Sequence, residues 1–130
     1  GPEMLEYLKS IVFKIELGGA LATPSESKIT IRDLMQRIQV GLKLPSSWSS
    51  RTNITDYDRV TKAPTRFMTL FSSQAGDMIT LTVGTYWKTP RWVVTIAHQT
   101  KPIDPKTQEF QDLEEAWKWI LQELPAVFKS

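Results

Sequence analysis

Residues Thr65–His98 read TRFMTLFSSQAGDMITLTVGTYWKTPRWVVTIAH. Apolar and polar residues alternate through three runs of this segment, which is the period-2 pattern of strands with one buried face. Short connections rich in turn-forming residues separate the runs, and strands joined this closely pair antiparallel. We therefore predict a three-stranded meander over residues 65–98, with strands at Thr65–Ser72, Met78–Trp87 and Arg91–His98.

A helix is predicted on each side of this meander. Before it, apolar residues recur at helical spacing after Thr30, a suitable N-cap, and they predict a helix over about 31–41. After it, Asp104 and Pro105 form a helix-start signal, and the pattern predicts a helix over about 105–124 that Pro125 ends. Because a small sheet with a bare apolar face is not stable, we expect both helices to pack on one face of it.

The N-terminal residues complete the predicted fold. Gly1-Pro2-Glu3 precedes Met4 and is typical of an expression-tag remnant. Residues 10–17 alternate in the manner of a further strand, although Leu5 and Leu8 alternatively begin a helix that runs into this segment. The prediction is a single α+β domain over residues 4–130, built on an antiparallel sheet of three to four strands.

The segment Pro45–Pro64 shows little periodicity and is rich in serine and threonine. Loops of this length are uncommon in compact domains and are usually functional or mobile. We predict a long loop here, pinned in part by Trp48, with fast amide exchange between Ser46 and Asp56.

Composition argues against several classes of protein. The 130 residues contain no cysteine, which excludes disulfides, thiolate zinc sites and a cysteine nucleophile. No apolar run reaches the length of a membrane span, so we expect a cytoplasmic protein with no membrane partner. His98 is the single histidine, and the common phosphate-loop, nucleophile-elbow and metalloprotease motifs are absent. We therefore expect no enzymatic activity, no cofactor and no metal site.

Charge is distributed unevenly along the chain. Residues 27–101 hold eleven basic and four acidic side chains, a net charge of +7, whereas residues 102–130 have a net charge of −3. Such an asymmetry suggests a nucleic-acid surface or a complementary protein partner. The alternative is that the two parts neutralise each other within one domain.

The hairpin segment Tyr86–Trp92 combines three aromatic residues with two cations. Tryptophan and arginine are enriched at protein interfaces, while interleaved aromatic and cationic side chains also bind bases and phosphates. Cross-strand packing of Trp87 against Trp92 is a third interpretation. We predict a non-enzymatic adaptor, inhibitor or accessory subunit that recognises a protein partner; the alternative is an accessory nucleic-acid-binding module using the same hairpin. The predicted contact residues are Tyr86, Trp87, Lys88, Arg91, Trp92, Trp48, Arg51, Arg59 and Arg66.

Overall fold

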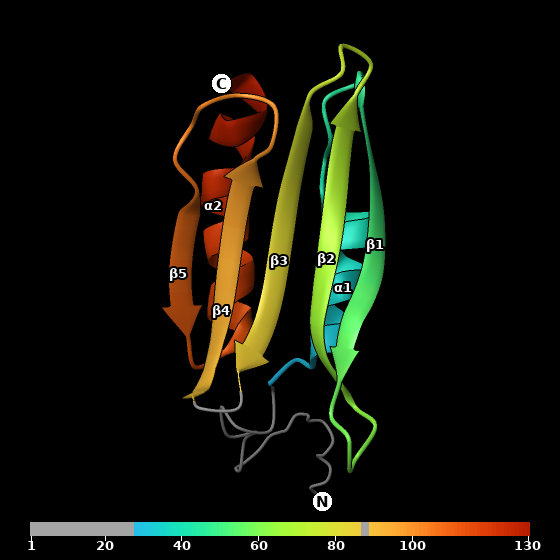
Figure 1. The fold of residues 1–130 in the computed structure, drawn as a ribbon, viewed down its shortest axis with the longest axis vertical. Coiled ribbons are helices and arrows are strands. Elements are labelled where there is room, and N and C mark those ends of the chain that lie inside the picture. Colours follow the sequence, from blue (N-terminus) through green and yellow to red (C-terminus); the bar gives the residue numbers. More distant parts are fainter. Residues whose placement is uncertain (1–27, 87–88) are drawn as a thin grey trace, which may run out of the picture.

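A computed structural model describes residues 28–86 and 89–130. In this part of the chain, five antiparallel strands form one open sheet, and each strand pairs with its neighbour in sequence. The two helices lie behind one face of the sheet, α1 behind β1 and β2, and α2 behind β4 and β5 (Figure 1). The elements are α1 (Ile31–Gly41), β1 (Trp48–Tyr57), β2 (Pro64–Ser73), β3 (Met78–Tyr86), β4 (Thr89–His98), β5 (Lys106–Phe110) and α2 (Leu113–Lys129).

The predicted α+β class agrees with this architecture, and the predicted meander corresponds to β2, β3 and β4. Phe67, Val83 and Val94 lie opposite one another across these three strands, and all three are fully buried on the helix-covered face. The alternation in sequence therefore predicts correctly which side chains face the helices, because successive side chains of a strand point to opposite sides.

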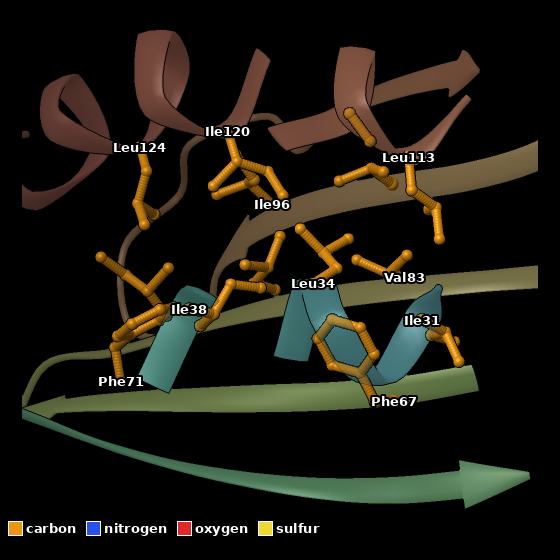
Figure 2. Close-up of a cluster of buried hydrophobic side chains, with 14 of the residues drawn as sticks. Ile31, Leu34, Ile38, Phe67, Phe71, Val83, Ile96, Leu113, Ile120 and Leu124 are labelled. Atoms are coloured by element: carbon orange, nitrogen blue, oxygen red, sulfur yellow. The ribbon is translucent and has the colours of Figure 1, made fainter. Parts of the chain in front are cut away.

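The buried core lies between the sheet and the two helices. Figure 2 shows Ile120 and Leu124 pointing from α2 into the same cluster as Ile38 of α1 and Phe71 of β2. Because the helices approach from opposite edges of the sheet, neither one covers it alone. The core therefore depends on both helices.

Helix α1 begins where the sequence predicts. The Thr30 hydroxyl accepts a hydrogen bond from Asp33 N–H at 3.1 Å, and the Asp33 carboxylate accepts one from Thr30 N–H at 2.8 Å. This reciprocal capping satisfies two N–H groups that have no partner within the helix. The hydrogen bond from the Thr30 backbone also holds the pKa of Asp33 below its usual value.

The predicted long loop at Pro45–Pro64 is wrong, because half of it, Trp48–Tyr57, forms the edge strand β1. Pairing with β2 extends from Trp48↔Ser73 to Tyr57↔Pro64, with irregularities after Ile54. The period-2 pattern is weak because polar side chains, Ser50 and Thr52, occupy half of the positions on the helix-covered side. Backbone pairing with β2 also removes the basis for expecting fast amide exchange here.

The predicted helix over residues 105–124 is also wrong at its start. Residues 106–110 instead form β5, which pairs with the outer edge of β4 from Trp92↔Phe110 to Ile96↔Lys106. Residues 106–110 form a strand despite the local helix signal, because pairing gives backbone hydrogen-bond partners to both β4 and β5. The sheet consequently has five strands in the described residues, rather than three to four, and the possible strand at 10–17 lies outside those residues.

Helix α2 begins after Asp112, whose carboxylate accepts a hydrogen bond from Glu114 N–H at 2.9 Å. It continues through Pro125, the predicted end of the helix, as far as Lys129. The proline is exposed, while Val127 beyond it is buried in the core. Packing of this last turn offsets the helix hydrogen bond that a proline cannot donate.

Substitutions of Asp112 and of Asp104, the predicted helix start, test where α2 begins. We expect Asp112→Ala to lower the free energy of unfolding by about 1 kcal/mol, because an N-cap acceptor is lost. Asp104→Ala serves as the matched control and should change this free energy by less than about 0.5 kcal/mol, since Asp104 is exposed. Urea denaturation followed by circular dichroism measures both values. A larger effect at Asp104 would contradict the described helix start.

Candidate functional site

The uncovered face of the sheet, opposite the helices, carries three of the predicted contact residues: Arg51, Arg66 and Arg91. Their neighbours in the strands face the core, and alternation places the arginines on the other side. The stem of Arg66 lies so close to Gly84 that a Cβ there would approach Arg66 Cγ to 2.7 Å. The sheet therefore places on one face cations that are up to forty residues apart in sequence.

Carboxylates accompany two of these three arginines. Arg66 Nη1 lies 3.3 Å from Asp56 Oδ2, and Arg91 Nε lies 3.9 Å from Glu109 Oε1. The sequence did not predict either pair, because both join residues on adjacent strands. The uncovered face consequently has a smaller excess of positive charge than its arginines alone suggest.

Two predicted tryptophans lie on the other, helix-covered side. Trp48 packs against Phe128 of α2 with ring centroids 5.0 Å apart, and Trp92 packs against the buried core. The structure thus separates these aromatic residues from the arginines with which the sequence grouped them. Trp87 and Lys88 lie outside the described residues, as does the side chain of Tyr86, so the hairpin surface stays a prediction.

Arg59 is exposed in the turn between β1 and β2. The neighbouring Asp58 organises this turn, since its carboxylate accepts hydrogen bonds from Thr61 N–H and Val60 N–H, each at 2.8 Å. These bonds, with that from Thr61 the stronger influence, hold the pKa of Asp58 below its usual value. This carboxylate therefore stabilises a turn.

His98 is buried at the end of β4. Its Nδ1 atom lies 3.3 Å from Thr100 N–H, and the Thr100 hydroxyl donates to Asp77 Oδ1 at 2.9 Å. These contacts hold the beginning of β3 against the end of β4. Within residues 28–86 and 89–130, no three histidine, cysteine or acidic side chains are grouped in a way that could hold a metal ion.

An apolar groove lies between the C-terminal part of α2 and the chain that leads from α1 into β1. We call it the α1–α2 groove; its volume is about 670 Å³. Leu121, Leu124 and Phe128 recur along α2 at spacings of three and four, so they share one face of the helix. The lining residues are Gly41, Leu42, Lys43, Leu44, Pro45, Ser47, Trp48, Leu121, Leu124, Pro125, Phe128 and Lys129.

The floor of the groove is continuous with the hydrophobic core. Phe128 contacts Phe71 edge to face, with ring centroids 5.3 Å apart, and Leu124 is buried. The rim is open to water, because 44% of the surface of Leu121 is exposed. The groove therefore has a buried apolar floor below an exposed apolar rim.

Comparisons of the chain with protein-family models, with curated proteins and with solved structures found no match. Neither helix in the described part of the chain is long and apolar enough to cross a membrane.

Sequence reasoning identified one groove residue, Trp48, and missed the rest. The two walls are separated by more than seventy residues, and local patterns cannot bring them together. A signal was nevertheless present in the apolar residues Leu42, Leu44 and Pro45, which follow the end of the predicted helix.

Proposed function

We propose that this domain is a non-enzymatic binding domain that recognises a partner protein through the α1–α2 groove. The observation that carries this proposal is the apolar lining of the groove together with its open rim. Apolar surface that stays in contact with water favours association, because covering it with another apolar surface lowers the free energy. An adaptor, an inhibitor or an accessory subunit would use such a surface.

A protein segment suits this groove better than a small molecule does. Small-molecule sites surround most of the surface of their ligand. Here Pro45, Leu121 and Pro125 are exposed along the rim, so a compact ligand would keep much of its surface in water. A polypeptide segment can continue beyond the groove on both sides.

Protein is also favoured over nucleic acid as the partner. Phosphate backbones are bound by clustered cations, and the groove lining contains two lysines among mainly apolar residues. The arginines lie on the opposite face of the sheet, where Asp56 and Glu109 offset two of them. A nucleic-acid-binding role would have to use that other face.

Selection of displayed random peptides on the full chain tests the proposal. We expect enriched peptides to carry apolar residues and to bind Leu121→Asp at least about tenfold more weakly, since the substitution places a charge in the groove. Val40→Asp is the matched control, because Val40 is 78% exposed on α1 and does not line the groove.

Fluorescence anisotropy of labelled peptides measures both affinities, and circular dichroism confirms that each variant is folded. Peptides whose affinity is the same for wild type and Leu121→Asp would contradict the proposal. A selection that enriches no peptide would contradict it as well.

A further inference from the structure

We propose that the segment bound in the α1–α2 groove is an amphipathic helix with acidic residues flanking its apolar stripe. This inference rests on the proposed function and specifies the class of partner. Two observations carry it: the backbone of the groove walls and the charge of the groove rim.

The walls of the groove favour a helix over an extended segment. An extended segment gains affinity by pairing its backbone with an open sheet edge. One wall here is α2, whose backbone groups are already used within the helix, and the other wall is the chain from Gly41 to Ser47, which precedes β1. A partner helix satisfies its own backbone groups and needs only to bury an apolar face.

The length of the apolar wall agrees with this. Leu121 and Phe128 are seven residues apart on α2, which corresponds to about 10 Å along a helix axis at a rise of 1.5 Å per residue. An apolar stripe at positions i, i+3, i+4 and i+7 of a partner helix covers the same length. Two turns of a partner helix would therefore fill the wall.

The charge of the rim specifies what flanks that stripe. Lys43 and Lys129 belong to opposite walls of the groove, both are exposed, and the described lining contains no acidic residue. The acidic side chains of α2 are engaged elsewhere. Glu114 pairs with Arg37 at 2.6 Å, and Glu123 pairs with Lys106 at 3.2 Å.

The groove consequently presents two positive charges beside its apolar floor. Carboxylates on both sides of a partner's apolar stripe would complement these charges. Complementarity of this kind contributes mainly to specificity and to the rate of association.

A helical peptide library tests the inference. Leucine is fixed at i, i+3, i+4 and i+7, the flanking positions encode glutamate or lysine at equal frequency, and the library is selected on the full chain. We expect glutamate to be enriched over lysine, and the selected peptides to bind the double variant Lys43→Glu, Lys129→Glu at least about tenfold more weakly.

The matched control is Lys28→Glu, Lys118→Glu, which changes net charge equally at two exposed lysines outside the groove. We expect this control to retain the wild-type affinity within about twofold, apart from weak long-range effects that salt screens. On the groove double variant, selection should favour lysine in place of glutamate. An unchanged preference there would overturn the inference.

The outcomes separate this inference from the proposed function. Binding that requires Leu121 but shows no enrichment of glutamate overturns the acidic-helix inference and leaves the proposed function standing. Random peptides that bind through Leu121, with no binder from the helical library, also overturn the acidic-helix inference alone. Peptide affinity that is unchanged by Leu121→Asp overturns both proposals.

Discussion

Replacing Phe67 by alanine is expected to lower the free energy of unfolding by about 3–5 kcal/mol. The Phe67 side chain is fully buried in the middle of β2, where it lies opposite Val83 and within the core beneath α1. Removing the ring leaves a cavity that the rigid sheet cannot close. Urea denaturation followed by tryptophan fluorescence measures this loss.

Met68→Ala is the control for this prediction, because Met68 is the next residue of β2 and points to the uncovered face of the sheet. We expect a loss of about 1 kcal/mol or less for this half-buried side chain. Equal losses at the two positions would mean that both faces of the sheet are covered, in conflict with the described layers.

Ile120→Ala is expected to lower the free energy of unfolding by about 2–5 kcal/mol. Ile120 is fully buried where α2 packs against the sheet, whereas the adjacent Leu121 is exposed on the groove rim. We expect Leu121→Ala to cost less than about 1 kcal/mol in the same urea denaturation. The reverse order would show that α2 turns its other face to the core, and it would remove the α1–α2 groove.

The parts of the fold that the sequence predicts correctly are those with strong burial on one face. In β3, Ile79, Leu81 and Val83 are all fully buried, so the period-2 pattern is complete. Helix α1 is similarly marked by its buried stripe and by the Thr30–Asp33 capping pair. In these elements, local propensity and tertiary packing favour the same structure.

The edge strands β1 and β5 were not predicted because their sequences lack the regular apolar pattern that burial of one face produces. In β1 the polar residues Ser50 and Thr52 interrupt the apolar residues on the helix-facing side, and in β5 only Phe110 adds a large apolar side chain on that side. The helix-start pattern at Asp104-Pro105 then dominated the interpretation of the residues that follow it. Tertiary pairing with β4 overrides such a local preference.

The candidate site was less predictable than the fold. Basic and aromatic residues close together in sequence suggested one patch, yet alternation along the strands sends Arg91 and Trp92 to opposite faces of the sheet. The α1–α2 groove depends on contacts between residues near the two ends of the described chain. Only the assembled fold brings those residues together.

The order of the strands has a consequence for how this groove forms. Each strand pairs with the next one along the chain, so the sheet can form from local hairpins that each close a short loop. The contacts that the helices make join residues far apart in sequence, as in the Arg37–Glu114 ion pair across seventy-seven residues. A folding intermediate that holds the sheet and one helix would therefore lack the groove. Such an intermediate would not bind the partner, so binding would begin only when folding is complete.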